Sequence, residues 1–147
     1  MTPRAGHVLA LGVLVAVGAG GCGRTAHPTD PESERQVRAV VETNVRALDR
    51  GDVRAHCETF TPRLLEAGKG GFAGCVAAVE RRPGGARAAR VKIRFRDILE
   101  YSDREGVSAY FTVNGSSRGY RLLLSDPVPE AGAGRRWLID AEEAGGD

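Results

Sequence analysis

Apolar residues recur every three or four positions through the segment that follows residue 30. This spacing places them along one side of an α-helix, and most of the charged residues fall on the other side. Thr29 or Asp30 is a candidate N-cap, Pro31 suits the first helical position, and Gly51 suits the C-terminal end. The pattern therefore predicts a long amphipathic helix, whose apolar stripe consists of Val37, Val40, Val41, Val45 and Leu48.

Shorter helices are expected after this one. Asp52 can cap the first of them, and the Thr61–Pro62 pair begins a further turn or two. Gly68–Gly71 ends that helix as a turn, because it lacks the spacing and the Ser or Thr of a phosphate-binding loop. The predicted short helices are Val53–Phe60, Arg63–Glu66 and Phe72–Glu80.

The second half of the chain alternates apolar and polar residues, which is typical of half-buried β-strands. In Val91–Arg96 the apolar residues are expected to point inward and the basic residues outward. The alternation slips near Asp97, which indicates a β-bulge. Loops are expected at Ser102–Gly106 and Asn114–Gly119. The predicted strands are Val91–Tyr101, Val107–Val113, Tyr120–Ser125 and Arg135–Ala141.

The first 21 residues have the parts of a secretory signal peptide: a basic residue (Arg4), an apolar run (Val8–Val17) and small residues before a cleavage site. The apolar run is too short for a transmembrane helix, which needs about 20 residues. Cys22 directly follows Ala19–Gly21, and this segment resembles the lipobox of bacterial lipoproteins, although Ala19 stands where Leu is usual. The resemblance implies diacylglyceryl transfer to Cys22 and cleavage before it. The alternative is plain secretion, with Cys22 incidental.

These features divide the chain into a signal peptide (1–21), a lipidated cysteine with its tether (22–30) and a single domain (31–147). The formal net charge is +2, and removal of Arg4 with the leader leaves +1. Nucleic-acid-binding proteins normally carry a strong basic excess, so we expect no nucleic-acid partner. The residues show no metal-ligand spacing, and we expect no metal and no other cofactor.

Cys57 and Cys75 remain as an even pair in the oxidising compartment that the leader predicts. A disulfide between them would join two predicted helices and close a loop of about 18 residues, which stabilises by roughly 3 kcal/mol in the chain-entropy model. The alternative is a reactive thiol or a metal site. His56 offers this alternative little support, because His56 adjoins Cys57 and its side chain would therefore point elsewhere on a helix. We expect His56 to be solvated or near a helix cap, and we predict the disulfide.

Helices followed by about four antiparallel strands predict an α+β fold. Three motifs carry a further resemblance: A-x-C-x-x-F-T-P at 55–62, G-G-F-x-x-C at 70–75 and R-R-W-L-I-D at 135–140. Together with the long N-terminal helix, they resemble the NTF2-like (SnoaL/cystatin-like) domains of actinobacterial lipoproteins. The resemblance implies N-terminal helices packed in the concavity of a curved, about four-stranded antiparallel sheet, which forms a cone able to hold a cavity.

Enzymes with that fold commonly place carboxylates and a tyrosine in the cone, where a buried Asp facing a Tyr could act as an acid or base. Tyrosines at alternating strand positions more often cover a sheet face. Asp97 and Asp140 are expected at bulges or edges that expose them. We therefore predict no catalytic site among the residues considered, which are Asp97, Tyr101, Tyr110, Tyr120 and Asp140.

A basic run without an acidic residue separates Glu80 from Asp97. Lys92, Arg94 and Arg96 share one face of the predicted strand. A tethered domain with such a face could bind anionic lipid headgroups, where each near-surface charge contributes about 1 kcal/mol. A wall polymer or an acidic partner would fit equally, and the alternative is a solvated sheet face whose basic residues pair with Glu100, Asp103 or Glu105. The candidate residues for binding an anionic surface are Arg87, Arg90, Lys92, Arg94 and Arg96.

The sequence thus predicts a cell-envelope lipoprotein on the extracytoplasmic face of the membrane, with a non-catalytic binding or accessory domain. Its expected partners are the membrane, through the lipid anchor, and an envelope protein, an anionic surface or a small apolar ligand. The alternative is a small-ligand carrier, or a small enzyme of the isomerase or dehydratase type, that uses the cone cavity. A carboxylate and a tyrosine converging in an enclosed pocket would favour the alternative. A cone filled by Val, Leu and Phe would favour the binding domain.

Overall fold

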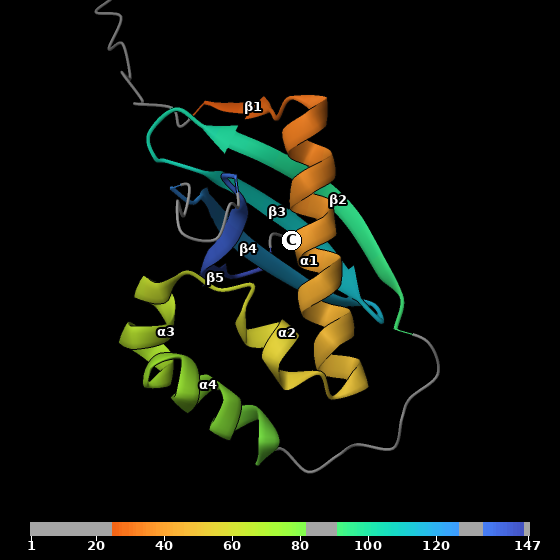
Figure 1. Ribbon diagram of the computed structural model, residues 1–147. Coiled ribbons are helices and arrows are strands. Elements are labelled where there is room, and N and C mark those ends of the chain that lie inside the picture. Colours follow the sequence, from red (N-terminus) through yellow and green to blue (C-terminus); the bar gives the residue numbers. More distant parts are fainter. Residues whose placement is uncertain (1–24, 82–90, 127–133, 146–147) are drawn as a thin grey trace, which may run out of the picture.

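The computed structural model describes residues 25–81, 91–126 and 134–145. They form an α+β fold in which one long helix crosses a five-stranded antiparallel sheet and three shorter helices gather beside it (Figure 1). The strands follow their chain order across the sheet. The elements are β1 (Ala26–Pro28), α1 (Pro31–Arg50), α2 (Val53–Cys57), α3 (Pro62–Lys69), α4 (Gly71–Glu80), β2 (Ile93–Tyr101), β3 (Val107–Val113), β4 (Ser116–Leu124) and β5 (Trp137–Glu143).

Helix α1 is the long amphipathic helix that the apolar spacing predicts. Its N-cap is Asp30, whose carboxylate accepts hydrogen bonds from the backbone N–H groups of Glu32 and Ser33 at 3.1 and 3.0 Å. Gly51 ends the helix with a φ of 75°, a conformation that glycine adopts without strain. The buried residues of α1 are Val37, Val41, Asn44 and Ala47.

The short helices follow the predicted order with shifted ends. Helix α2 stops at Cys57, before the predicted end, and α3 extends beyond it to Lys69. The predicted turn Gly68–Gly71 is reduced to Gly70, which separates the two helices with a φ of 70°, because Gly68 and Lys69 belong to α3 and Gly71 to α4. At Gly74 a Cβ atom would clash with the carbonyl oxygen of Lys69, so glycine allows the two helices to approach this closely.

The β3–β4 hairpin corrects one predicted loop. Asn114 and Gly115 have positive φ values of 50° and 88° and form a two-residue turn, so β4 begins well inside the predicted loop Asn114–Gly119. Asn-Gly suits such a turn because both of its central residues need positive φ. The bulge predicted near Asp97 is confirmed, since the register of β2 against β3 shifts between Phe95 and Asp97.

The sheet has five strands, and the predicted number of about four is corrected by an edge strand within the predicted tether. Ala26–Pro28 pairs antiparallel with the end of β2, with Ala26 opposite Tyr101 and Pro28 opposite Leu99. All three residues of β1 are exposed, so the strand leaves no alternating apolar pattern in the sequence. Part of the segment 22–30 therefore belongs to the folded domain.

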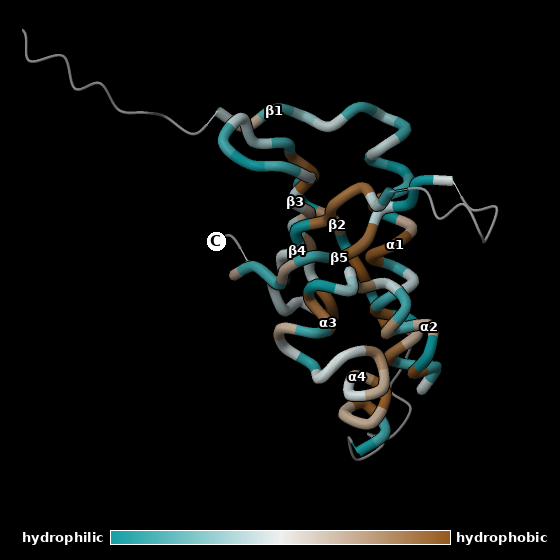
Figure 2. The backbone as a smooth tube through the Cα atoms, turned by 60° about the vertical axis from the view of Figure 1, so that its left-hand side comes forward, coloured by the Kyte–Doolittle hydropathy of each residue, from teal (hydrophilic) through white to brown (hydrophobic). Residues whose placement is uncertain are grey.

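The core lies between α1 and the sheet, where the hydrophobic stretches of the chain face one another (Figure 2). Val37 and Val41 of α1 are fully buried there. They meet large side chains of the sheet that are at most 1% exposed, Phe111, Leu122 and Ile139. Around Val37 and Val41, the space between α1 and the sheet is thus filled by packed aliphatic and aromatic side chains.

Candidate functional site

A cleft of about 680 Å³ lies where the short helices meet the ends of β4 and β5. Its volume is within the range of small-molecule sites in proteins. Leu124, on its wall, is 42% exposed and is the one exposed large apolar side chain in the described part of the chain. The apolar lining consists of Phe60, Leu65, Phe72, Leu123, Leu124 and Leu138.

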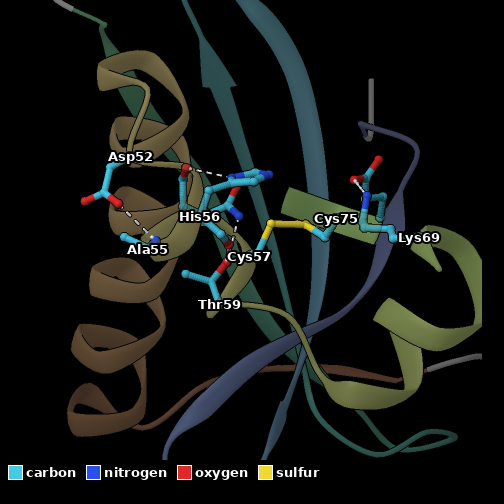
Figure 3. The surroundings of a disulfide bond; sticks show 9 residues. Asp52, Ala55, His56, Cys57, Thr59, Lys69 and Cys75 are labelled. Atoms are coloured by element: carbon cyan, nitrogen blue, oxygen red, sulfur yellow. Dashed lines mark hydrogen bonds and ion pairs between the residues drawn. A yellow bond between two sulfur atoms is a disulfide. The ribbon is translucent and has the colours of Figure 1, made fainter. Parts of the chain in front are cut away.

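The walls of this cleft are held by a disulfide and by pairing with β5. Cys57 of α2 and Cys75 of α4 form the predicted disulfide, with their Cα atoms 6.1 Å apart and both residues buried (Figure 3). Between α2 and α3, the Thr61 N–H donates to the carbonyl oxygen of Ile139 at 2.9 Å. The Ile139 N–H donates in turn to the carbonyl oxygen of Thr59 at 2.8 Å. These contacts fix the start of α3 against the edge of β5.

The polar wall of the cleft contains a buried carboxylate, Asp140, which is 2% exposed. Its Oδ1 accepts hydrogen bonds from Thr61 Oγ1 and Arg63 Nε, both at 3.0 Å. Its Oδ2 accepts hydrogen bonds from Arg63 Nη2 and from Arg121 Nη2, the latter at 2.8 Å. The carboxylate thus joins the start of α3 to strands β4 and β5.

The burial of Asp140 corrects the expectation that a bulge or edge would expose it. The residue does lie at a bulge, because the register of β4 against β5 shifts between Arg121 and Leu122, but Thr61 and Arg63 cover it. Burial alone would raise the pKa of Asp140. The hydrogen bonds from Arg63, Thr61 and Arg121 outweigh burial, so the pKa is lowered. Asp140 is therefore ionised at neutral pH, and both its oxygens are already bonded.

A second polar network connects α1, α2 and β4 beside a smaller cleft of about 280 Å³. The Tyr120 hydroxyl donates to Asn44 Oδ1 at 3.1 Å, and Asn44 Nδ2 donates to Thr59 Oγ1 at 2.7 Å. Burial, together with the nearby charge of Glu142, raises the pKa of Tyr120 to about 12. The Tyr120 hydroxyl therefore keeps its proton at neutral pH.

His56 belongs to the same network. We expected it to be solvated or near a helix cap; it is buried, and it lies in the last turn of α2 close to the C-cap. It is 7% exposed, and its ring meets that of Phe60 edge to face at 5.1 Å. Its Nδ1 lies 3.1 Å from the carbonyl oxygen of Asn44 and must donate there, because a carbonyl oxygen only accepts. Figure 3 shows His56 beside the disulfide, at the junction of α1 and α2. Because His56 lies in the packed interior, the carbonyl oxygen of Asn44, and not water, accepts the hydrogen bond from its ring.

Two of the remaining candidates lie on the sheet face turned away from α1. The hydroxyls of Tyr101 and Tyr110 are 3.4 Å apart, and Tyr110 donates to Glu143 Oε2 at 3.3 Å. Burial, the contact with Tyr101 and the charge of Glu143 raise the pKa of Tyr110. Asp97 is exposed at its bulge, as expected. Tyr101 and Tyr110 thus meet on this face, with Asp97 opposite Tyr110 in the strand register, whereas Tyr120 and Asp140 lie at two other places.

The basic residues of β2, and Lys92 just before it, lie as the alternation predicts, although the strand begins at Ile93 and not at the predicted Val91. Lys92, Arg94 and Arg96 are exposed, whereas Ile93 and Phe95 pack against the core. The other residues proposed to bind an anionic surface, Arg87 and Arg90, lie outside the described residues, and so does Cys22.

Two further findings concern residues 25–81, 91–126 and 134–145. No group of three or more His, Cys, Asp or Glu side chains in these ranges could hold a metal ion. None of the helices in these ranges is long and apolar enough to cross a membrane.

Sequence reasoning missed the partners of Asp140 and the apolar cleft. Arg63 lies 77 residues from Asp140 in the chain, so no local motif could connect them. One signal was present, because the Thr61–Pro62 helix start fixes where Arg63 must lie on the first turn of α3. The cleft has no such signal, since its lining comes from α2, α3, α4, β4 and β5.

The fold and its clefts define a class of protein: an α+β domain with a five-stranded antiparallel sheet, a disulfide between two short helices and an apolar cleft beside them. Compared with known proteins, the chain matches no family model, no curated protein and no solved structure. The NTF2-like resemblance therefore rests on the sequence motifs.

Proposed function

We propose that this chain is a cell-envelope lipoprotein whose NTF2-like domain is non-catalytic and binds an apolar ligand, or an apolar segment of a partner, in the 680 Å³ cleft. One observation carries the proposal: the lining is mainly apolar, and the buried carboxylate beside it is already saturated with hydrogen bonds. Such a site offers hydrophobic contact and a fixed polar edge.

The polar groups support binding rather than catalysis. A general acid or base must be able to exchange a proton with the reacting group. Asp140 has a lowered pKa and is held by Arg63 and Arg121. Tyr120, with a pKa of about 12, keeps its proton and donates a hydrogen bond to Asn44 Oδ1. In this proposal both residues stabilise the domain.

The disulfide supports the proposed location. Structural disulfides persist in oxidising compartments outside the cytoplasm, which accords with a signal peptide at 1–21. The domain would then be held on the extracytoplasmic face of the membrane by acyl chains on Cys22.

Mass spectrometry of the N-terminal peptide tests this anchor. The mature protein is expected to begin at Cys22 and to carry at least two acyl chains, because one chain gives only marginal membrane binding. An unmodified Cys22 thiol, or a mature chain that begins elsewhere, would contradict the anchor. Replacement of Cys22 by Ser is the control, and it should release the protein from the membrane fraction in a high-salt wash that leaves the acylated protein bound.

The apolar cleft is tested by Leu124→Asp. The substitution removes a partly exposed apolar side chain and places a charge on the cleft wall. We expect the affinity for the apolar anionic probe anilinonaphthalene sulfonate to fall about tenfold or more, which corresponds to about 1.4 kcal/mol. Fluorescence titration of the folded protein measures the change.

The matched control is Ser116→Asp, because Ser116 is exposed at the opposite end of the same strand, β4. Both variants should unfold at nearly the same urea concentration as the parent, since exposed substitutions usually change stability by no more than about 0.5 kcal/mol. Equal probe affinity in the two variants would reject the cleft as the binding site.

The alternative, a small-ligand carrier or small enzyme of the isomerase or dehydratase type, is favoured by the smaller cleft. There Tyr120 and Glu142 are directly opposite each other on β4 and β5 and both line the space. A ligand held in this cleft would be lost on Tyr120→Phe and retained on Leu124→Asp. The packed core between α1 and the sheet around Val37 and Val41 favours the binding domain instead.

A further inference from the structure

The anchor proposed above would hold the sheet close to the membrane. Ala26 is fixed in the fold, because β1 pairs with β2 and Ala26 lies opposite Tyr101. Three residues, 23–25, separate Ala26 from Cys22. The four residue steps between them span at most about 14 Å in a fully extended chain. An acylated Cys22 would therefore keep the β1 edge of the sheet within about that distance of the headgroups.

The sheet face turned away from α1, here termed the outer face, has side chains that suit a membrane surface. Phe95 lies opposite Phe111, which is buried against the core, so the alternation of the strand places Arg94 on the outer face. Tyr101 and Tyr110 lie on the same face, and tyrosine is common at membrane–water interfaces. In the described part of the chain no helix lies across this face (Figures 1 and 2).

The exposed charges of β2 and the residue before it are divided between the two ends of the strand. The basic residues Lys92, Arg94 and Arg96 are exposed at its start, exposed Asp97 follows at the bulge, and exposed Glu100 lies near its end. Anionic headgroups attract such basic clusters, and the attraction fades beyond a Debye length of about 8 Å at physiological salt. The tether joins the fold beside Tyr101, whereas the basic cluster lies at the Ile93 end of the same strand. The cluster therefore reaches the bilayer only if the outer face lies flat along it.

We propose that the outer face lies against the headgroups of an anionic membrane, with Lys92, Arg94 and Arg96 near the lipid phosphates and α1 turned away. The inference rests on the proposed acylation of Cys22 and adds the orientation in which the anchored domain is held. An extended bilayer surface is the occupant that fits, because the tether holds the Tyr101 end of β2 near the headgroups and the exposed basic residues lie at the other end of the same strand.

Vesicle binding tests the contribution of charge. The protein used, here the parent, is the chain of residues 22–147 with Cys22→Ser, which contains every described element and no acyl group. The triple variant Lys92→Gln, Arg94→Gln and Arg96→Gln should bind vesicles of phosphatidylglycerol and phosphatidylcholine about 100-fold more weakly than the parent. The parent should lose binding in high salt and should not bind phosphatidylcholine alone.

The matched control removes the same charge from the opposite side of the fold. Arg35, Arg46 and Arg50 are exposed on α1, and their joint replacement by Gln should leave vesicle affinity within about twofold of the parent. Circular dichroism confirms that each variant is folded. Equal losses in the two triple variants would overturn the proposal. A parent that binds no anionic vesicle would also overturn the proposal. The same holds if sedimentation experiments show that the parent instead forms a dimer through this face.

Orientation is tested with the acylated protein in nanodiscs that contain quencher lipids. A fluorophore at Thr112→Cys, on the outer face, should be quenched more strongly than one at Ala39→Cys, on the exposed side of α1. Equal quenching would overturn the orientation. Because vesicle binding is measured without acyl chains, an unmodified Cys22 with intact vesicle binding would reject the anchor while retaining the outer face as the membrane-binding surface.

Discussion

Replacement of Cys57 and Cys75 by Ala is expected to lower the free energy of unfolding by about 3 kcal/mol or more. The disulfide closes a loop with a sequence separation of 18, and in the chain-entropy model this constraint on the unfolded state accounts for about 3 kcal/mol. Both sulfur atoms are buried, so the variant also loses packing contacts. Urea unfolding measures the loss, and the midpoint of thermal unfolding should fall by about 10–15 °C.

Reduction separates the effect of the cross-link from that of packing. The parent measured with a phosphine reductant keeps both sulfur atoms and loses only the bond, so most of the stability loss should appear there. The double Ala variant should give the same unfolding curve with and without the reductant. If full reduction leaves the stability of the parent unchanged, the bond between α2 and α4 does not stabilise this domain.

The elements that the sequence predicted well are those whose signal is local. Helix α1 combines a capping Asp30, a proline and a terminal Gly51 with one apolar stripe, and each feature independently indicates the same helix. Strand β3 was predicted with its observed bounds, because its alternation is unbroken from Val107 to Val113. The cysteine pair was predictable because only two cysteines follow Cys22.

The elements that were missed depend on partners far away in the chain. Strand β1 consists of three exposed residues, and it exists because the end of β2 offers unpaired backbone groups. The early start of β4 was a different error. There the local signal, Asn114–Gly115, was present and typical of a two-residue hairpin turn. Recognition of that turn would have placed β4 correctly.

The candidate site was less predictable than the fold for the same reason. A polar residue at a bulge is usually solvated, so sequence reasoning favoured an exposed Asp140. Its burial follows from the pairing of the Thr59–Thr61 segment with Ile139, which brings Arg63 over the bulge. Residues joined only by tertiary contacts cannot be recognised from one sequence, and the lining of the apolar cleft is of this kind.

Asp140→Asn is expected to destabilise the domain by about 2–3 kcal/mol. Breaking a buried ion pair by changing one partner typically costs about 3–5 kcal/mol. The expected value here is smaller because the partners are partly solvated, with side chains that are 65% exposed in Arg63 and 28% in Arg121. Asparagine has nearly the shape of Asp, so the change removes charge and one acceptor without opening a cavity. Urea unfolding at pH 7 measures the effect.

The control for this substitution is Glu142→Gln, on the same strand. Its carboxylate is 61% exposed and lies 3.8 Å from Lys69 Nζ, a contact that should contribute no more than about 0.5 kcal/mol. If the two variants are destabilised equally, the buried hydrogen bonds of Asp140 do not account for its effect.

The pH dependence of the free energy of unfolding tests whether the charge of Asp140 is the cause of its stabilising effect. Its pKa is lowered in the folded state, so the unfolded chain takes up a proton first as the pH falls. The stabilising contribution is therefore fully present above about pH 5 and is lost as the pH falls through the folded-state pKa. Protonated Asp resembles Asn, so the stability difference between the parent and Asp140→Asn should shrink over this window. A difference that stays constant from about pH 7 to pH 3 would mean that the shape of the side chain, and not its charge, holds α3 against the sheet.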